Sequence, residues 1–342
     1  MKITILDDYQ DVVRTLPCFS LLNDHEVTIH NTPAANDAEL IARLQDQDVL
    51  VLIRERTEIR AALLRQLPQL KLISQTGKVS NHLDVPACTA HQVAVAEGVG
   101  SPVAPTELCW ALIMAASRHL LPYGERLQQG QWQQSGSLGL GRVLHGRTMG
   151  IWGFGKIGQR IAAIASAFGM QVVVWGSETS RQAAASQGYQ AAGSKAEFFS
   201  GVDVLSLHLR LNTHTQACVT ADDLALMKPD ALFVNTSRAE LVAPGALVAA
   251  LRLGRPGFAA VDVYEQEPAT PANEPLLTMP NVLCTPHLGF VEQDSYTLYF
   301  EKAFENVVNY ANGQPTGIAN ESVLMTARHC GAAQVSSLKE ER

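Results

Sequence analysis

The chain has 342 residues, of which 46% are hydrophobic and 17% are charged. This composition is typical of a globular protein with a large buried core, and it excludes disorder over most of the chain. The 26 Lys and Arg against 33 Asp and Glu give a net charge of −7, which argues against nucleic acid or an anionic membrane surface as the main partner.

The patterns of secreted and membrane proteins are also missing from the sequence. Asp7, Asp8 and Asp11 interrupt the region where a signal peptide would be apolar. No apolar run approaches the ~20 residues that span a bilayer. The 6 cysteines are scattered, without the close pairs of a zinc site or a disulfide framework. We therefore expect a cytoplasmic protein with reduced thiols and no metal site.

The first part of the chain alternates short apolar runs with helical stretches, which predicts βα units and a parallel sheet covered on both faces. A zone rich in Gly, Ser and Pro, residues 76–105, then precedes a long predicted helix that begins at Thr106 and ends near Leu120. The predicted strands are 2–7, 27–30, 49–53 and 70–74, and the helices between them are 37–45 and 60–66.

The same alternation begins again after Gly146, so the sequence predicts an α/β protein with two parallel-sheet domains. Beyond Asn320 the pattern fades, and we expect residues 321–342 to form a mobile tail. The predicted strands of this second block are 149–154, 171–175, 202–208, 231–235, 258–263 and 282–284, with helices over 156–168, 220–227, 244–253 and 291–311.

A glycine motif, residues 153–158, directly follows one predicted strand and opens a predicted helix. In this context the motif is typical of a dinucleotide-binding loop. Gly153 permits a tight turn, Gly155 lets the backbone approach a pyrophosphate, and Gly158 lets the helix pack closely on the strand. The helix N-terminus then offers free N–H groups to the phosphates.

The next strand lacks the acidic residue that usually binds the ribose hydroxyls of NAD, because Gly176 occupies that position. Glu178 could reach the ribose, or Ser177 and Arg181 could hold the 2′-phosphate of NADP. Equally, Glu178 and Arg181 could be solvated surface charges. The choice between NAD and NADP stays open at this point.

Three later strand ends carry polar residues, at the edge where α/β sheets bind their ligands. Arg238, Glu267 and His287 follow three consecutive predicted strands. Arg can clamp a carboxylate through two hydrogen bonds. His can exchange a proton with a carbinol oxygen, and a neighbouring carboxylate orients the imidazole. Each residue alone could be an ordinary surface or capping residue, but together they form a chemically complete set beside a dinucleotide loop.

The segments GFGKIG, FVNTSRAELV, AAVDVYEQEP and TPHLG resemble, in order and spacing, the signature segments of the D-isomer-specific 2-hydroxyacid dehydrogenases. The resemblance covers roughly residues 2–320. It implies that Arg238 binds the substrate carboxylate, that His287 is the general acid/base and that Glu267 polarises it. It also implies that Asp262 holds the nicotinamide carboxamide. The cofactor contacts expected by resemblance are Gly153, Gly155, Lys156, Ile157, Gly158, Gly176, Ser177, Thr236, Ser237, Asp262 and Gly289.

The resemblance further implies a flavodoxin-like substrate domain, residues 1–104 plus 291–320, and a Rossmann NAD(P)-binding domain, residues 105–290. The substrate residues expected in the first domain are Arg54, Gly77, Lys78 and Val79, where Val79 replaces the usual second glycine of the loop. A homodimer formed through the cofactor domain, with residues 106–132 in its interface, is also implied. We also expect no C-terminal regulatory domain of the kind that longer phosphoglycerate dehydrogenases carry.

These residues predict hydride transfer between NAD(P) and a D-2-hydroxy acid, either like a phosphoglycerate dehydrogenase or like a hydroxypyruvate/glyoxylate reductase. Two alternatives stay open. One is a dinucleotide-sensing binding protein, similar to the corepressors that resemble this family. The other is a formate dehydrogenase, although relatives with that activity usually carry Gln in place of Glu267.

Overall fold

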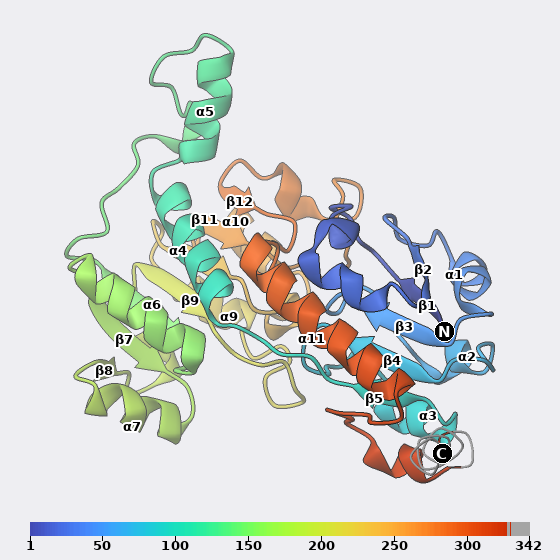
Figure 1. Cartoon of the computed structure of the whole chain (residues 1–342). Coiled ribbons are helices and arrows are strands. Elements are labelled where there is room, and N and C mark those ends of the chain that lie inside the picture. The colour runs from blue at the N-terminus through green and yellow to red at the C-terminus, as the bar shows by residue number, and fades with distance from the viewer. Residues whose placement is uncertain (327–328, 330–342) are drawn as a thin grey trace, which may run out of the picture. The chain divides into compact units, whose positions relative to one another are not determined.

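The protein is described here from a computed structural model, which covers residues 1–326 and 329. The chain divides into two compact units, each built around a parallel β-sheet (Figure 1). Unit 1 is Met1–Ser101 with Glu292–Arg342, and unit 2 is Pro102–Val291. The predicted fold class, two α/β domains with parallel sheets, is confirmed. Within the described residues no helix combines the length and apolar character that crossing a membrane requires.

Unit 1 contains five parallel strands in the order β2-β1-β3-β4-β5. Helix α11 packs against β4 and the 3-10 segment η2, and it buries Phe300, Phe304 and Val307 there. The strands are β1 (Lys2–Ile5), β2 (Glu26–Ile29), β3 (Val49–Leu52), β4 (Leu72–Gln75) and β5 (Ala94–Ala96). The helices are α1 (Asp37–Leu44), α2 (Ala61–Leu64), α3 (Val85–Ala90) and α11 (Gln293–Ala311), with 3-10 segments η1 (Val13–Thr15), η2 (Pro17–Leu22) and η6 (Glu321–Met325).

Two parts of unit 1 differ from the prediction. The zone 76–105 contains α3, whose first turn is capped by Asp84 accepting from the Ala87 N–H, and the short strand β5. The first residues of the tail predicted from residue 321 onward are ordered structure, because Glu321–Met325 forms η6 and buries Val323 beside β5. Residues 327–328 and 330–342 of that tail lie outside the described residues.

Unit 2 contains seven parallel strands in the order β12-β11-β10-β9-β6-β7-β8. The strand order reverses between β6 and β9, so a ligand-binding crevice is expected at the carboxyl ends of these two strands. The strands are β6 (Thr148–Trp152), β7 (Gln171–Trp175), β8 (Gln190–Ala191), β9 (Val204–Leu207), β10 (Leu232–Asn235), β11 (Phe258–Val261) and β12 (Val282–Cys284). The helices are α4 (Val103–Ser117), α5 (Leu120–Gln128), α6 (Lys156–Ala167), α7 (Glu178–Ser186), α8 (Lys195–Gly201), α9 (Ala221–Ala225) and α10 (Ala246–Arg252), with 3-10 segments η3 (Gly136–Leu138), η4 (Ala239–Leu241) and η5 (Pro275–Thr278).

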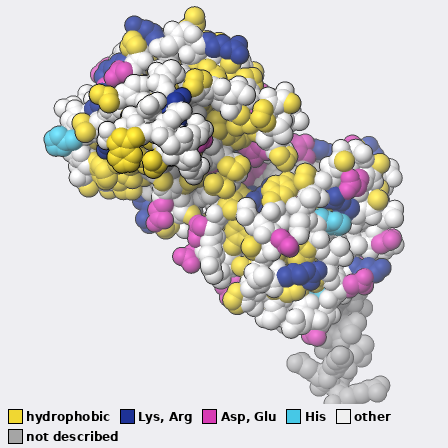
Figure 2. All heavy atoms as spheres, turned by 90° about the horizontal axis from the view of Figure 1, so that it is seen from above, with side chains coloured by type: hydrophobic (Ala, Val, Ile, Leu, Met, Phe, Trp, Pro, Cys, Tyr) yellow, Lys and Arg dark blue, Asp and Glu magenta, His cyan; other side chains and the backbone are white. Residues whose placement is uncertain are grey.

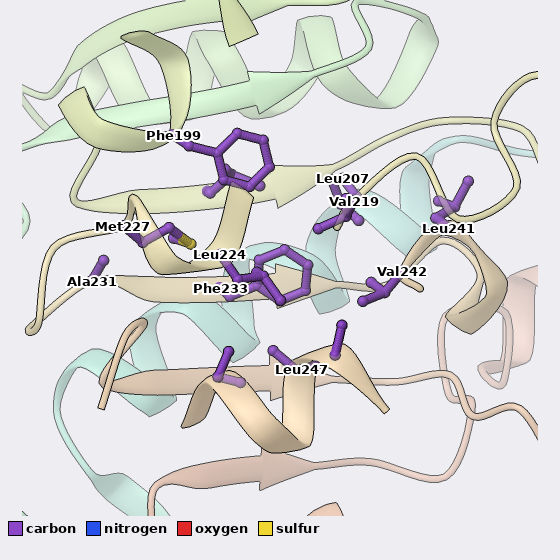
Figure 3. Packing of buried hydrophobic residues seen from close by; sticks show 14 of the residues in the cluster. Phe199, Leu207, Val219, Leu224, Met227, Ala231, Phe233, Leu241, Val242 and Leu247 are labelled. Atoms are coloured by element: carbon purple, nitrogen blue, oxygen red, sulfur yellow. The ribbon is translucent and has the colours of Figure 1, made fainter. Parts of the chain in front are cut away.

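Apolar side chains from helices and strands fill one face of the unit 2 sheet (Figure 3). Phe199 of α8, Phe233 of β10 and Leu247 of α10 belong to this cluster, and both phenylalanines are fully buried. A second cluster, which includes Ile113 of α4 and Ile161 of α6, packs on the opposite face. Because both faces are covered, the strands are mainly apolar, and polar groups for chemistry lie chiefly at their ends.

The long predicted helix of unit 2 is two helices. α4 already begins at Val103, and Pro105 fits its first turn because N–H groups there have no acceptor within the helix. The helix stops at Ser117, since His119 adopts a left-handed conformation with φ 51° before α5 begins. The segments α7, β8 and α8 form between β7 and β9, where no elements were predicted. α5 stands away from the rest of unit 2 (Figure 1).

Candidate active site

The glycine motif forms a tight connection between β6 and α6 that leaves space for a ligand. Gly153 has φ 99°, and a side chain there would lie 2.5 Å from the His208 carbonyl oxygen. At Gly158 a side chain would lie 2.2 Å from the Gly153 carbonyl oxygen. By contrast, nothing lies within 4 Å of a side chain built at Gly155. Gly155 caps α6 without a side-chain acceptor for the first N–H groups, which include those of Lys156 and Ile157. These features fit a dinucleotide pyrophosphate.

The end of β7 carries an ion pair next to the glycine motif. Gly176 has φ 147°, and Ser177 caps α7 by accepting from the Ser180 N–H. The Arg181 guanidinium lies 2.6 Å from the Glu178 carboxylate and stacks 5.1 Å from the centroid of a Trp175 ring. Glu178 and Arg181 are therefore bound to each other in the structure, rather than separately solvated.

His287 and Glu267 form a hydrogen-bonded pair at the carboxyl edge of the sheet. The His287 Nδ1 atom lies 2.7 Å from Glu267 Oε2. Since a carboxylate accepts, Nδ1 carries the proton, and Nε2 is left to exchange a proton with a ligand. The other carboxylate oxygen, Oε1, accepts from the Tyr264 backbone N–H at 3.0 Å, which fixes the carboxylate. His287 has φ 52°, a conformation that non-glycine residues rarely adopt.

Asp262 anchors the loop that carries His287. Its Oδ1 accepts from Thr285 Oγ1 at 2.6 Å and from the Leu288 N–H at 2.7 Å, and its Oδ2 accepts from the Gly289 N–H at 2.9 Å. The side chain is 0% exposed. Burial raises the pKa of Asp262, although these hydrogen bonds act in the opposite direction. The arrangement makes Asp262 a support for His287, in addition to any contact with a cofactor.

Arg238 follows β10, the next strand but one from β12, so it shares this sheet edge with Glu267 and His287. Its backbone carbonyl accepts from Asn235 Nδ2 at 2.8 Å, and Asn235 Oδ1 accepts from the Ser237 N–H at 3.0 Å. Ser237 Oγ in turn donates to the Leu207 carbonyl at 2.6 Å. Thr236 lies in the same turn. This network ties the turn after β10 to the end of β9.

Sequence reasoning missed several supporting residues. Tyr264 and Asn235 lie within the recognised segments but carry no signal of their own. His208, at the end of β9, places Nε2 3.0 Å from Ser206 Oγ, and burial lowers the pKa of His208 to about 4. His208 is therefore neutral at physiological pH. Ser206 Oγ also lies 3.4 Å from Cys109 Sγ.

The expected substrate residues of unit 1 lie at the carboxyl ends of β3 and β4. Arg54 has φ 55°, and its N–H donates to Thr76 Oγ1 at 3.0 Å. A side chain at Gly77 would lie 2.0 Å from an Arg54 guanidinium nitrogen, so this glycine makes room for Arg54. Lys78 Nζ lies 2.9 Å from Glu97 Oε2, and the Val79 N–H donates to Glu97 Oε1 at 2.9 Å.

Comparison with known proteins agrees with this geometry. Residues 110–289 match the family described as "D-isomer specific 2-hydroxyacid dehydrogenase, NAD binding domain". The chain belongs to this family. Glyoxylate reductase of Aeropyrum pernix is 33% identical over 293 residues, which are 83% of this chain and 86% of that protein. D-3-phosphoglycerate dehydrogenase of Methanocaldococcus jannaschii is 33% identical over 288 residues, 80% of this chain but 54% of that protein, so the chain spans about half its length.

A solved structure extends the comparison to nearly the whole fold of this dehydrogenase family member. The crystal structure of phosphoglycerate oxidoreductase from Vibrio cholerae O395 is 63% identical, with a TM-score of 0.89, and the alignment covers 91% of this chain and 99% of that chain. The matched NAD-binding domain lies within unit 2 and contains the glycine motif. The family match thus confirms the nicotinamide dinucleotide cofactor predicted from the sequence, NAD(H) with NADP(H) not excluded.

Proposed function

We propose that the protein is an NAD-dependent oxidoreductase that interconverts a D-2-hydroxy acid and the corresponding 2-keto acid. The observation that carries this proposal is the Glu267–His287 pair, with 2.7 Å between His287 Nδ1 and Glu267 Oε2, on the same sheet edge as Arg238 and the glycine motif. A protein that only senses dinucleotides has no need of a polarised imidazole. A carboxylate at position 267 also argues against the formate dehydrogenase alternative.

In this proposal each residue has one task. The bound cofactor supplies or accepts a hydride at its nicotinamide ring. Arg238 binds the substrate carboxylate, because a guanidinium can donate two parallel hydrogen bonds to it. His287 Nε2 gives a proton to the keto oxygen during reduction and takes it back during oxidation. Glu267 holds the imidazole in the required tautomer and stabilises its charged form through Nδ1.

The test combines cofactor binding with turnover. We expect NADH fluorescence titration to show binding, and hydroxypyruvate, glyoxylate, pyruvate or 2-ketoglutarate to oxidise the bound NADH. His287→Ala should lower kcat by about 10²–10⁴-fold, while the Kd for NADH stays near that of the native protein. Arg238→Ala should chiefly raise KM for the keto acid. Turnover within a few-fold of native in both variants would reject the proposal.

We further propose that NAD(H) is preferred over NADP(H). Arg181 is the cation at the end of β7 that could hold a 2′-phosphate, but Glu178 already neutralises it at 2.6 Å. A 2′-phosphate would also meet the negative charge of Glu178, since like charges disfavour binding. Titration with NADH and NADPH checks this directly. Equal or tighter binding of NADPH would contradict it.

For assembly we propose a homodimer formed through unit 2. The support is a set of apolar side chains on and after α5 that solvent would otherwise contact: Leu140 is 91% exposed and Trp132 is 72% exposed, and Leu120, Leu127 and Val143 are also exposed. Figure 2 looks onto this end of the molecule and shows hydrophobic side chains at the surface of unit 2. A patch of this kind is typical of an association surface. Light scattering should give the dimer mass, and Leu127→Glu should shift it toward the monomer.

We also propose a cytoplasmic location. The support is that Cys18, Cys88, Cys109, Cys218 and Cys284 are free thiols, which is typical of a reducing compartment. Fractionation of cells that express the tagged protein tests this.

A further inference from the structure

The chain beyond β9 lies against the glycine motif of unit 2. β6 and β9 pair in parallel, and the His208 N–H extends this pairing by donating to the Trp152 carbonyl at 2.8 Å. A side chain built at Gly153 would lie 2.5 Å from the His208 carbonyl oxygen and 3.0 Å from the Leu209 side chain. Residues 208–210 therefore border the crevice where the strand order reverses, next to the start of α6.

Side chains along this segment alternate between the two faces of the sheet. One series points into, or packs against, the apolar cluster of Figure 3: Leu207, Leu209 and Leu211. The other series faces the opposite way, because Ser206 Oγ lies 3.0 Å from His208 Nε2 and 3.4 Å from the Cys109 thiol of α4. Arg210 is the next residue of this second series. Its side chain is therefore directed to the face of the sheet that carries α4 and α6.

Arg210 carries the positive charge of the segment on this face. Burial lowers the pKa of His208 to about 4, so the imidazole beside it is neutral at physiological pH. Arg181, the cation after β7, is bound to Glu178 at 2.6 Å. Arg210 is exposed, and no carboxylate among the described residues lies within ion-pair distance of it. Its guanidinium group is thus available to an anionic ligand.

The turn that follows Arg210 is held by its own side chains. Thr215 Oγ1 donates to the Arg210 carbonyl at 2.6 Å, and the Asn212 N–H donates to Thr215 Oγ1 at 2.9 Å. Asn212 Oδ1 accepts from the His214 N–H at 2.8 Å. The backbone of Arg210 is therefore anchored before any ligand binds. This reduces the conformational entropy that a ligand contact by its side chain would cost.

We propose that Arg210 is a further cofactor-binding residue, whose guanidinium group binds the pyrophosphate of the dinucleotide beside the free N–H groups at the start of α6. A helix N-terminus supplies only a partial positive charge, whereas the pyrophosphate is doubly negative. A guanidinium group adds a full charge and can donate two parallel hydrogen bonds to a phosphate. The inference rests on the cofactor binding of the proposed function. It predicts that Arg210 contributes equally to the affinities for NADH and NADPH, which share the pyrophosphate.

The first test compares ligands with and without a pyrophosphate. Arg210→Met removes the charge but keeps an unbranched side chain. It should weaken the binding of ADP-ribose, NADH and NADPH by one common factor of about ten-fold or more, and change that of adenosine by less than about two-fold. Arg210→Lys should restore part of the loss. Because the side chain is exposed, the melting temperatures of both variants should equal that of the native protein.

Arg252→Met is the matched control. Arg252 is also exposed, but it is the last residue of α10, which leads from the end of β10 to the start of β11. It therefore lies toward the opposite edge of the sheet, and the control should bind all four ligands like the native protein. If Arg210→Met weakens NADPH alone, Arg210 contacts the 2′-phosphate and the proposal is overturned. Native affinity of Arg210→Met for ADP-ribose, or an equal loss for adenosine, also overturns it.

Steady-state kinetics separate this inference from the proposed function. Arg210→Met should raise KM for NADH and leave kcat within about two-fold, because a phosphate contact is the same in the ground state and the transition state. If the loss of ADP-ribose affinity appears while no keto acid is reduced, the role of Arg210 stands and the proposed function fails. If keto acids are reduced and Arg210→Met binds NADH like the control, the role of Arg210 is rejected and the proposed function stands.

Discussion

The carboxylate of Glu267 bridges the His287 imidazole and the backbone of its own loop, with His287 Nδ1 at 2.7 Å and the Tyr264 N–H at 3.0 Å. Both oxygens are used as acceptors. A glutamine has only one acceptor oxygen, so Glu267→Gln must lose one of the two contacts or turn its amide N–H toward a donor. The position of the imidazole therefore depends on a side chain at position 267 that has two acceptor oxygens, as an ionised carboxylate does.

For Glu267→Gln we expect kcat to fall by about 10–100-fold, since the imidazole loses the group that orients it. NADH affinity should stay near that of the native protein, because the pair does not contact the glycine motif. Steady-state kinetics and fluorescence titration measure the two quantities. Glu265→Gln, the same charge change two residues earlier, is the control and should behave like the native enzyme. A kcat equal to that of the control would show that Glu267 does not assist His287.

Asp262→Asn tests whether the buried carboxylate supports the loop of His287. An amide at this position faces the N–H groups of Leu288 and Gly289 with one acceptor instead of two. The backbone N–H that loses its acceptor should lower the free energy of unfolding by about 1–3 kcal/mol. We also expect kcat to fall, because the loop that carries His287 becomes less firmly held. Thermal unfolding and kinetics check both effects. If only NADH affinity changed, with stability intact, Asp262 would act as a cofactor contact and not as a loop anchor.

Two alanine substitutions in the glycine motif should affect different properties, one the affinity for NADH and the other the stability of the fold. At Gly155 the new methyl group meets no protein atom within 4 Å, so Gly155→Ala should fold normally but occupy the space of the pyrophosphate. We expect NADH to bind about ten-fold more weakly with an unchanged melting temperature. At Gly153, with φ 99° and a carbonyl oxygen 2.5 Å from the new atom, stability itself should fall. Normal NADH affinity in Gly155→Ala would contradict the placement of the pyrophosphate.

Asp203 gives unit 2 a pH-dependent stability. It accepts from Lys228 Nζ at 2.8 Å and from the Thr148 N–H at 2.8 Å. Burial raises the pKa of Asp203, but these hydrogen bonds outweigh it, so that the pKa lies below its ordinary value in the folded protein. The stabilisation is therefore fully present above the unfolded-state pKa of about 4 and is lost as the pH falls through the lower folded-state pKa.

Asp203→Asn should accordingly be less stable than the native protein by about 1–2 kcal/mol at neutral pH, because a charged acceptor is lost. The difference should shrink as the pH is lowered from neutral through the folded-state pKa of Asp203, because the native carboxylate becomes protonated there as well. Melting temperatures measured across this range give the comparison. The exposed Asp24→Asn serves as control. A difference that stayed constant with pH would mean that the loss arises from packing and not from the charge of Asp203.

Most of the geometry of the candidate site could be predicted from the sequence, because parallel topology brings residues that follow adjacent strands to one edge of the sheet. The strand over 171–175 and the strand over 282–284 were predicted with the bounds of β7 and β12. Arg238, Glu267 and His287 follow three adjacent strands of the sheet, as their spacing indicated. The contact between Glu267 and His287 is a consequence of that adjacency.

Other features lacked a local signal. β5 is three residues long and β8 is two, too short for a periodic pattern to stand out. The break between α4 and α5 depends on the left-handed backbone conformation of His119. Such a conformation is usually indicated in a sequence by glycine, and no glycine stands at this position. Glu97 contacts Lys78 across 19 residues of sequence, and this contact follows from the pairing of β4 with β5.

The order of the two units along the chain has a consequence for biosynthesis. Unit 2 is one uninterrupted stretch, Pro102–Val291, whereas unit 1 is completed only by residues that follow it. The core of unit 1 needs Phe300 and Phe304 of α11 against β4 and η2. On the ribosome, the cofactor-binding unit is therefore complete while the first hundred residues still expose the apolar surface that α11 will cover, and a nascent chain truncated before α11 carries a finished unit 2 attached to an unfinished unit 1.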